Sequence, residues 1–562
     1  MKKILCLALA LILVLALFAG CNKDDGNHSG GGAQIDTDAT YTPNPPLDWP
    51  QYPASDVGQN ILPFDNVVAV TKNLPLCGEK ATYTAWWPLG GFGAQYWTNM
   101  SEAANMQELE NRTNIHIEYS HPSSNELSAA FPLMIASEDY CDMIYSANLY
   151  TGGGDKAIED GVYIRLNELI DAYAPNYTAI RNYTDDARKG TITSKGNIWG
   201  FYNICKEHMP GYMGLNIRQD YMDKVGITQR PVTIDDWDKT LGTMKDALNT
   251  EYAIAIPPTG VTRHSAFLSA WDVGSDWFQR DGKAMYGPAQ PEFRNYVELM
   301  IDWYNRGLLR NDFYAVAPEN YTSVISEDYG KGDYVAVDGQ NFFGSMLSRY
   351  SDNAFGIAIR QPVLNRGDES HIRFDQGVIN GDQLAITTAC KNPELAVSWM
   401  DYRYTYEGYL LIYYGVEGLT YVRDGDHHIS ITDNIINNPD GKSPFSELFK
   451  YLATTQTCTL CDYTNGWCFL DPAYAEEITV WMQDKCDHNY PANLGLLTPE
   501  DGAEFAAIYN DIDTYVQETI PKFIIGQISM DKYDDFVSQM YRMNLDRAIE
   551  LKQIALDDYN NR

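Results

Sequence analysis

Residues 81–88 (ATYTAWWP), 115–119 (IHIEY) and 142–147 (DMIYSA) are three short apolar runs that decide the fold class of this chain. Each run has the length and the β-branched or aromatic content of a buried strand. The segments between and after them have apolar residues at helical spacing: 101–113, 131–136 and 166–173. Strands that alternate with helices in this way predict an α/β architecture with a parallel sheet.

Further along the chain, several segments begin with residues that cap helices. Thr233 precedes Asp236 by three positions, which is the arrangement of a capping box. Asn392 is followed by a proline at the first helical position. Thr498 and Ser529 each open a segment with a stripe of apolar residues at helical spacing. We therefore expect a helical C-terminal region whose stripes face the core.

The first residues have the pattern of an export signal. Two lysines precede an unbroken apolar run over residues 4–18, which is too short for a confident membrane span. The ending 17–21 (LFAGC) resembles the lipobox of bacterial lipoproteins, with Phe18 where leucine is usual. This resemblance predicts a signal peptide over 1–20, lipid attachment at Cys21 and a flexible tether over 21–60. The alternative is an ordinary secretory peptide that is cut nearby.

Length and charge limit the possible functions. A chain of 562 residues is longer than one hydrophobic core supports, so two or more lobes are expected. The formal net charge of −35 repels nucleic acid over most of the surface, and no nucleic-acid partner is expected. Outside the signal, no stretch reaches eighteen consecutive apolar residues.

Four cysteines lie within thirty residues: Cys458, Cys461, Cys468 and Cys486. With His488 beside the last of them, the group suggests either a zinc site or a disulfide. Its spacing matches no zinc ribbon, so no metal is predicted there. A disulfide fits an exported protein better, and its pairing is open.

Catalytic motifs are weak or missing. The glycine run 152–154 follows a predicted strand, but at the wrong distance for a dinucleotide fingerprint. Residues 441–443 (GKS) lack the first glycine of a phosphate-binding loop. The chain contains neither GxSxG nor HExxH, and 76 acidic residues make any carboxylate pair uninformative. We expect no catalytic residue and no cofactor.

From about residue 80 to the C-terminus, the chain resembles the larger lipoproteins of extracellular solute-binding protein family 1, the ligand receptors of ABC importers. Four groups of segments carry the resemblance, in the family's order: 107–118 (QELENRTNIHIE) with 133–142 (LMIASEDYCD); 199–202 (WGFY) with 214–226 and 233–237; 281–283, 286–288 and 303–308 (WYNRGL); and 386–402 with 414–421 (YGVEGLTY), 437–444 and 522–527 (KFIIGQ).

The resemblance implies a periplasmic-binding-protein-like (type 2) fold with two hinge-linked α/β lobes and a ligand cleft between them. Lobe 1 is expected over 61–198 plus 337–415, and lobe 2 over 199–336 plus 416–562. The implied partners are ABC permease subunits and the membrane that holds the lipid, and the chain is expected to be a monomer. Some members carry a calcium loop, but the corresponding stretch 245–257 lacks its acidic ligand series.

Many members of this family bind oligosaccharides. A sugar presents an apolar face to an aromatic ring and hydroxyls to polar side chains, and twelve tryptophans and forty tyrosines offer such rings. Nine residues are predicted to contact the ligand because of their places in the expected fold. Some end a strand or lie near a lobe crossing, and others occupy loops or precede a strand expected at 384–387. They are, in chain order, Trp86, Trp87, Trp199, Trp271, Asp272, Trp277, Asp382, Tyr463 and Trp467.

The sequence therefore predicts a receptor without catalytic activity that delivers an oligosaccharide to an ABC importer. Three alternatives stay open, since a fold does not set the ligand. The first is a binding protein for a peptide or another small solute. The second is a glycosidase or lyase on a lipid tether, for which no enzyme family's pattern is found in the sequence. The third is a sensor module that reports its ligand to a membrane kinase.

Overall fold

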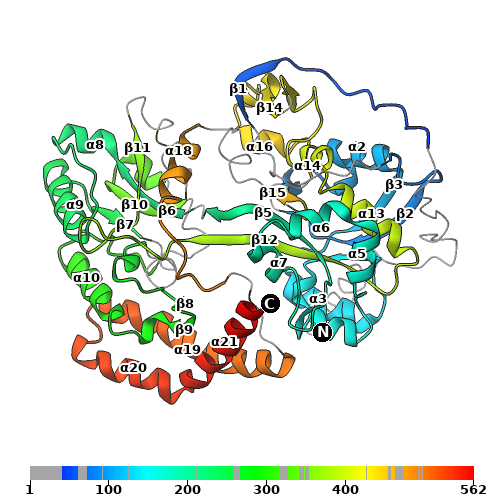
Figure 1. Ribbon diagram of the computed structural model, residues 1–562. Coiled ribbons are helices and arrows are strands. Elements are labelled where there is room, and N and C mark those ends of the chain that lie inside the picture. Colours follow the sequence, from blue (N-terminus) through cyan, green and yellow to red (C-terminus); the bar gives the residue numbers. More distant parts are fainter. Residues whose placement is uncertain are drawn as a thin grey trace, which may run out of the picture. The chain divides into compact units, whose positions relative to one another are not determined.

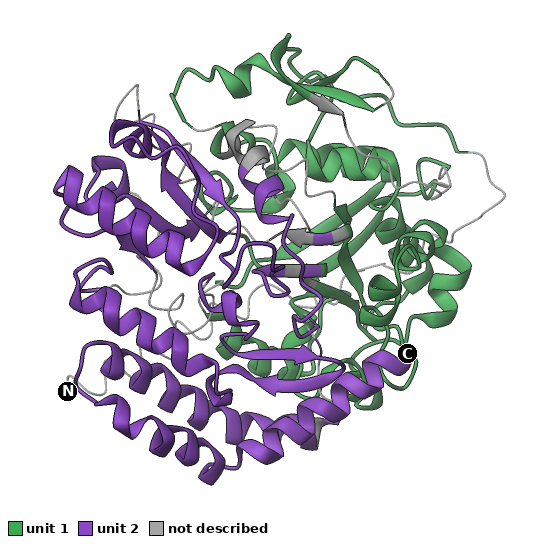
Figure 2. Ribbon diagram, turned by 60° about the vertical axis from the view of Figure 1, so that its left-hand side comes forward, with its two compact units in different colours: residues 1–207, 378–466 green, residues 208–377, 467–562 purple. Residues whose placement is uncertain are grey.

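The computed structural model describes residues 41–60, 73–90, 93–123, 126–210, 213–256, 266–315, 327–340, 347, 354–425, 427–442, 444–453, 457–461, 472–491, 494 and 498–562. The chain forms two compact units (Figure 2). Unit 1 comprises residues 1–207 and 378–466, and unit 2 comprises 208–377 and 467–562. The lobe boundaries predicted after residues 198, 336 and 415 stay predictions.

Unit 1 is built on a sheet with the strand order β15-β5-β12-β4-β2-β3 (Figure 1). Its strands are β2 (Ala81–Trp86), β3 (Ile115–Ser120), β4 (Met143–Tyr145), β5 (Phe201–Pro210), β12 (Asp375–Ile386) and β15 (Leu460–Cys461). β2 runs parallel to β3 and β4, which confirms the parallel pairing predicted for these strands. β12 runs antiparallel to β4, so the sheet as a whole is mixed.

The helices of unit 1 are α2 (Ala104–Thr113), α3 (Leu127–Ser137), α4 (Gly153–Glu159), α5 (Asn167–Tyr173), α6 (Pro175–Arg181), α7 (Asp185–Gly190), α13 (Pro393–Tyr402), α14 (Tyr406–Tyr413), α15 (Asp433–Ile436) and α16 (Pro444–Leu448). The buried carboxylate of Asp401 joins two of them, because it accepts hydrogen bonds from Asn176 Nδ2 (2.8 Å) and Tyr177 N (2.7 Å). Two distant parts of the sequence are thereby fixed in one core.

The segment before the first predicted strand is extended and lies on unit 1. β1 (Ala54–Asn60) pairs with β14 (His428–Thr432), which also pairs with β13 (Tyr421–Arg423). Asn44 Nδ2 donates to the carbonyl of Asn111 (2.7 Å), and Trp49 Nε1 donates to Glu108 (3.2 Å). These contacts place the described part of the predicted tether, from residue 41, against the folded unit.

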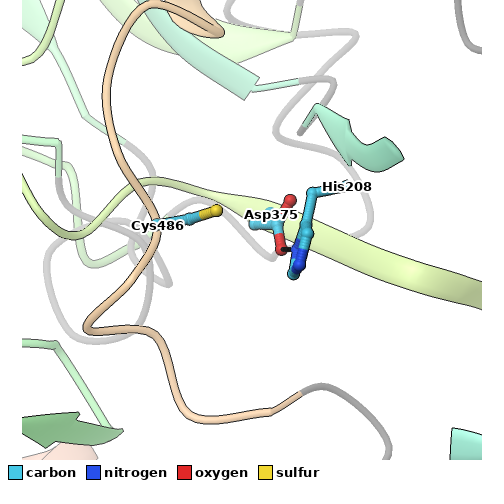
Figure 3. A group of neighbouring side chains, drawn as sticks. All are labelled: His208, Asp375 and Cys486. Carbon is cyan, nitrogen blue, oxygen red and sulfur yellow. Dashed lines mark hydrogen bonds and ion pairs between the residues drawn. The ribbon is translucent and has the colours of Figure 1, made fainter. Parts of the chain in front are cut away.

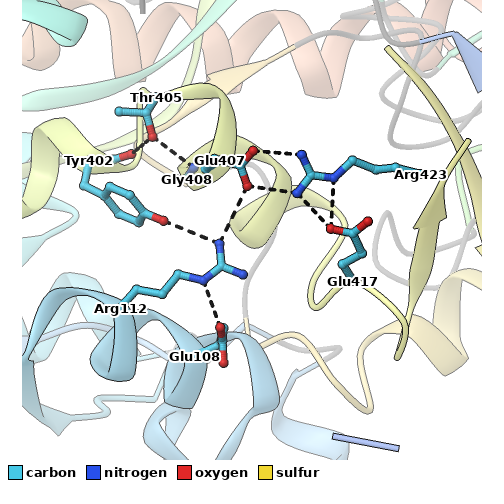
Figure 4. Close-up of polar contacts among 8 residues, drawn as sticks. All are labelled: Glu108, Arg112, Tyr402, Thr405, Glu407, Gly408, Glu417 and Arg423. Carbon is cyan, nitrogen blue, oxygen red and sulfur yellow. Dashed lines mark hydrogen bonds and ion pairs between the residues drawn. The ribbon is translucent and has the colours of Figure 1, made fainter. Parts of the chain in front are cut away.

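A charged network connects α2 and α14 (Figure 4). Arg112 pairs with Glu108 (2.9 Å) and lies 4.0 Å from Glu407. The guanidinium of Arg423 donates two hydrogen bonds to Glu407 (2.8 and 3.0 Å) and pairs with Glu417 (2.8 Å). Such bidentate pairs fix the orientation of both partners.

Unit 2 contains a sheet with the order β11-β6-β10-β7 and a hairpin, β8-β9. The strands are β6 (Met213–Arg218), β7 (Ile254–Ala255), β8 (Trp277–Arg280), β9 (Lys283–Tyr286), β10 (Ala336–Gln340) and β11 (Gly356–Ile359). β6 is antiparallel to both its neighbours, whereas β10 and β7 are parallel. Gly214 of β6 lets this sheet approach the ring of Trp481, because a Cβ at that position would lie 2.4 Å from the ring.

The helices of unit 2 are α8 (Gln219–Lys224), α9 (Ile234–Leu248), α10 (Phe293–Asn305), α18 (Pro472–Trp481), α19 (Pro499–Ile524), α20 (Tyr533–Arg542) and α21 (Leu545–Asn561). α19 packs against α10 and α21, as Figure 1 shows. The core centres on edge-to-face rings: Phe267 lies 5.2 Å from Trp237 and 4.9 Å from Trp303 between ring centroids. The predicted helical C-terminal region is confirmed.

The local signals read from the sequence agree well with the structure. Thr233 and Asp236 form the predicted capping box of α9, and Asn392 caps α13. Strand β4 ends earlier than predicted, because Ser146 has the left-handed conformation with φ 62°. Asp382 was predicted to precede a strand at 384–387, but it lies inside the long strand β12. No helix of the described residues is long and apolar enough for a membrane span.

Candidate functional site

A cavity of about 200 Å³ lies in unit 2. Its walls come from a short 3₁₀ helix (Leu268–Trp271), the loop into β8 and the start of β8, the segment 372–375 that leads into β12, and residues 489–490. The lining residues are Ser269, Val273, Gly274, Ser275, Asp276, Trp277, Phe278, Gln361, Ile372, Arg373, Phe374, Asp375, Asn489 and Tyr490. We call this cavity the unit 2 pocket.

Glycine allows the turn on one side of the pocket. A Cβ on Gly287 would lie 1.7 Å from the carbonyl oxygen of Gly274, so the chain after β9 and the loop before β8 touch backbone to backbone. Asp272 ends the 3₁₀ helix in the left-handed conformation with φ 54°. Its carboxylate lies 3.1 Å from Arg280 Nε and 2.8 Å from His488 Nδ1. The loop is thus tied to β8 and to the segment near residue 488.

On the other side of the pocket, two chain segments run side by side. His488 N donates to the carbonyl of His371 (3.0 Å). The Asn489 side chain brackets Arg373, because Asn489 Oδ1 accepts from Arg373 N (3.3 Å) and Asn489 Nδ2 donates to Arg373 O (2.8 Å). These bonds hold the backbone of Arg373 in place while its guanidinium lines the pocket.

Gln361 is held by a buried carboxylate. Its backbone N donates to Asp484 Oδ2 (2.9 Å), whose other oxygen accepts from Arg360 Nε (2.9 Å). Burial raises the pKa of Asp484, and Arg360 and the Gln361 amide oppose this rise. The side chain of Gln361 is thereby positioned at the pocket wall.

Four lining side chains have a buried polar atom without a hydrogen-bond partner among the described residues. They are Gln361 Oε1, Asp375 Oδ1, Arg373 Nε and Trp277 Nε1. Buried polar atoms normally have partners, and each one left without a partner costs about 1–3 kcal/mol. Two of the four atoms accept and two donate, so a ligand with hydroxyl groups matches them, since a hydroxyl does both.

An aromatic group supports Trp277 from behind. Its ring lies 5.1 Å from that of Tyr286 and 5.8 Å from that of Tyr509, between centroids. Lys552 Nζ lies 5.6 Å from the Trp277 ring centroid, and burial lowers the pKa of this lysine, an effect that Asp276 opposes. Tyr509 donates a 2.6 Å hydrogen bond to Asp276. Trp277 is therefore a firmly packed ring at the edge of the pocket.

Of the residues predicted from sequence to contact the ligand, Trp277 lines this pocket. Trp271 ends the adjoining 3₁₀ helix and Asp272 caps it. Neither tryptophan lies in a loop as predicted, since Trp277 is the first residue of β8. Trp86, Trp87 and Trp199 are buried in unit 1, where Trp86 packs on Phe131, Trp87 stacks on Tyr145 and Trp199 stacks on Tyr163. The side chain of Asp382 and the residues Tyr463, Trp467 and Cys21 lie outside the described residues. As ligand contacts, all nine candidates stay predictions.

Sequence reasoning missed most of the polar wall: Gln361, Arg373, Asp375, Asn489 and Tyr490. The one usable signal is the alternation of apolar and charged residues over 372–375 (IRFD). In a chain with 76 acidic residues, such a pattern does not distinguish a pocket from an exposed edge.

Three of the four clustered cysteines form no disulfide, and the expectation of a disulfide stays untested for the fourth. Cys458, Cys461 and Cys486 are not disulfide-bonded, while Cys468 lies outside the described residues. Cys141, which the pattern did not single out, is disulfide-bonded. Two groups of described side chains have metal-ligand geometry: His208, Asp375 and Cys486, and His371, Asp487 and His488.

Several known proteins resemble this chain in sequence or in fold. The fructooligosaccharide ABC transporter substrate-binding protein FusA of Streptococcus pneumoniae serotype 4 is 23% identical over 499 residues, which cover 82% of this chain and 87% of that protein. The structure of S. pneumoniae FusA in complex with kestose superposes with a TM-score of 0.63 at 19% identity, covering 85% of this chain and 99% of that chain.

A human-milk-oligosaccharide-binding solute-binding protein of Bifidobacterium longum infantis, associated with an ABC transporter, gives a TM-score of 0.71 at 14% identity, covering 85% of this chain and 99% of that chain. These likenesses confirm the predicted α/β fold of two-lobed binding proteins. The family model described as bacterial extracellular solute-binding protein matches residues 97–409. Because this match spans more than half of the 562 residues, the chain belongs to the bacterial extracellular solute-binding proteins.

Proposed function

We propose that this protein binds an oligosaccharide outside the cytoplasmic membrane, that Cys21 anchors it there through lipid, and that it delivers the sugar to the permease of an ABC importer. Family membership supports the role of an ABC solute-binding protein. The ligands named for two of its relatives, fructooligosaccharides and human milk oligosaccharides, support a sugar.

The observation that carries the sugar proposal is the composition of the unit 2 pocket. The ring of Trp277 lines the pocket, and its Nε1 is one of four buried polar atoms there that lack partners among the described residues. A pyranose or furanose offers C–H groups for the ring and hydroxyls for the donors and acceptors. A peptide would satisfy the same atoms through its amides, and it is the runner-up ligand.

The anchoring part rests on the lipobox-like sequence that ends at Cys21, and delivery to a permease rests on the family. We propose no catalytic step. The chain contains neither of the hydrolase motifs GxSxG and HExxH, and the relatives are named as binding proteins.

A thermal-shift screen of the purified protein with fructo-, gluco-, galacto-, manno- and xylo-oligosaccharides tests the proposal. A ligand at about 100 times its Kd should stabilise the fold by about 2.7 kcal/mol. Chromatography of each mixture shows in parallel whether the sugar has been broken down. A shift with the sugar recovered intact supports a receptor, and breakdown products would identify an enzyme instead. If no sugar shifts the transition while a peptide does, the sugar proposal is wrong.

A further inference from the structure

Three side chains of unit 2 that are far apart in sequence meet at one point (Figure 3). His208 comes from β5, Asp375 begins β12, and Cys486 lies in the segment after α18. Their ligand atoms all lie within 4.8 Å of one another. In Figure 3 the sulfur of Cys486 points toward Asp375, and His208 lies on the other side of that carboxylate.

The thiol of Cys486 differs from the other described thiols. Cys77, Cys205, Cys390, Cys458 and Cys461 are buried, whereas Cys486 is partly exposed. An accessible thiol beside a carboxylate and an imidazole has access to ions from solvent. The buried cysteines behave as small apolar residues.

Asp375 provides a second, independent observation. Its side chain is only 4% exposed, and Oδ1 is buried with no hydrogen-bond partner among the described residues. Oδ2 is satisfied, since it lies 2.8 Å from His208 Nδ1 and accepts from Gly377 N (3.1 Å). A buried carboxylate with one unpartnered oxygen is costly unless a cation or a donor completes it.

We propose that His208, Asp375 and Cys486 form a binding site for a zinc ion, with water as the fourth ligand. Thiolate, imidazole and carboxylate are the ligands that zinc takes in tetrahedral sites. A thiolate argues against calcium or magnesium, which select oxygen ligands. The site shares no residue with the stretch 245–257, where the family resemblance placed the calcium loop of some members.

The distances suit a tetrahedral ion after a small adjustment. Zinc bonds of about 2.0–2.3 Å set neighbouring ligand atoms about 3.2–3.8 Å apart. The described ligand atoms span at most 4.8 Å, and the His208–Asp375 pair is 2.8 Å apart. The ion would bind the carboxylate of Asp375, whose Oδ1 has no hydrogen-bond partner among the described residues, together with the His208 imidazole. The Cys486 thiol would lose its proton to solvent when it binds the ion.

Arg373 now balances the carboxylate from the pocket side, with Nη2 at 3.6 Å from Asp375 Oδ1. This distance is too long for a hydrogen bond, so a divalent ion can replace the interaction without leaving a bond unmade. Because Asp375 and Arg373 also line the unit 2 pocket, a bound ion would complete the wall of that pocket. The proposal stands on the three ligands and does not depend on the identity of the solute.

The test uses the full-length chain, purified in detergent, treated with a chelator and kept reduced. Zinc affinity is measured by competition with a chromogenic chelator, and cobalt is used as a spectroscopic substitute. We expect one zinc per chain and a sulfur-to-cobalt charge-transfer band. Cys486→Ser should abolish the band, and both Cys486→Ser and His208→Gln should weaken zinc binding by more than tenfold, because losing even a residue that only positions a ligand costs about 10–100-fold.

Two histidine variants serve as matched controls. His427→Gln changes a histidine of unit 1 that packs on Tyr406, and it should leave zinc affinity unchanged. His371→Gln removes a member of the other histidine group and should also leave it unchanged. Zinc binding that survives both Cys486→Ser and His208→Gln, or that only His371→Gln removes, overturns the proposal, as does a wild-type chain that binds no zinc.

Discussion

A substitution at Gln361 should change ligand affinity without lowering the stability of the unliganded protein. Its Oε1 is buried at the pocket wall without a partner among the described residues, whereas its backbone N is satisfied by Asp484. Gln361→Met removes the acceptor and keeps the shape of the side chain. We expect sugar affinity to fall about fivefold, since a hydrogen bond contributes about 1 kcal/mol, while the unliganded protein keeps or gains stability. Titration calorimetry and urea unfolding measure the two effects.

Gln219 offers the matched control for this substitution. It lies on the surface at the start of α8, where its Nε2 donates to Asp223. Gln219→Met should change neither affinity nor stability by more than about 0.5 kcal/mol. A clear loss of stability in unliganded Gln361→Met would show that Oε1 has a structural partner. Oε1 would then not be an acceptor that is available to the ligand.

Asp338 gives a prediction about pH. Burial raises the pKa of its carboxyl from 3.8 to about 7, although the amide of Ala266 donates to it and opposes the rise. Between these two values the folded protein keeps a proton that the unfolded chain has released, so the free energy of unfolding falls as pH rises. Asp338→Asn removes this loss and keeps an acceptor for Ala266. Relative to wild type, the variant should gain up to about 4 kcal/mol between about pH 4 and about pH 8.

Urea unfolding at the two pH values measures this effect. Asp534→Asn, at a carboxylate that is 92% exposed, is the control and should show no such trend. A constant difference between Asp338→Asn and wild type at both pH values would show that Asp338 is ionised throughout.

At the same scale, sequence reasoning recognised Trp277 but not the polar residues around it. A tryptophan in a predicted loop is rare enough to be noticed, although Trp277 begins β8 in the structure. Arg373 and Asp375 belong to an ordinary alternation of charged and apolar residues. Their meeting with Asn489 depends on chain segments more than 100 residues apart, as the Asn489–Arg373 bonds show. No local pattern contains that information.

At the scale of elements, the N-terminus of α9 provides a test of a signal that the sequence contains. Thr233 accepts a hydrogen bond from Asp236 N (3.1 Å), and Asp236 accepts one from Thr233 N (3.0 Å). Thr233→Ala leaves an amide of the first turn without its acceptor, so we expect a loss of about 1 kcal/mol in the free energy of unfolding. Thr233→Ser retains the hydroxyl and should recover most of it. Equal losses in the two variants would assign the effect to packing of the threonine methyl group.

Elements were predictable where the signal is local. The caps of α9, α13 and α19 and the strands β2 and β3 follow from neighbouring residues. The antiparallel entry of β12 beside β4 joins residues about 240 positions apart, such as Leu384 and Tyr145, and it was not predictable. The break after β4 was missed for a different reason: Ser146 adopts a left-handed conformation that serine rarely takes.

At the scale of the whole molecule, the chain passes between the two units three times, after residues 207, 377 and 466. Two of these passages lie inside β5 and β12. Length alone predicted more than one lobe, because a single core does not grow to this size. The passages carry no signal in composition, since a strand that continues from one unit into the next has the same pattern on both sides.

The proposed attachment of the molecule to a membrane depends on one atom, the sulfur of Cys21. Stable anchoring requires more than one acyl chain, and the lipobox-like sequence predicts a lipidated cysteine there. Cys21→Ser should therefore move the protein from the membrane fraction to the extracytoplasmic soluble fraction and abolish incorporation of labelled palmitate. Cys6→Ser is the matched control, because that cysteine lies within the predicted signal peptide and should leave both readouts unchanged. If the Cys21→Ser variant stays in the membrane fraction, another part of the chain attaches the protein to the membrane. The proposal of a lipid anchor at Cys21 would then be wrong.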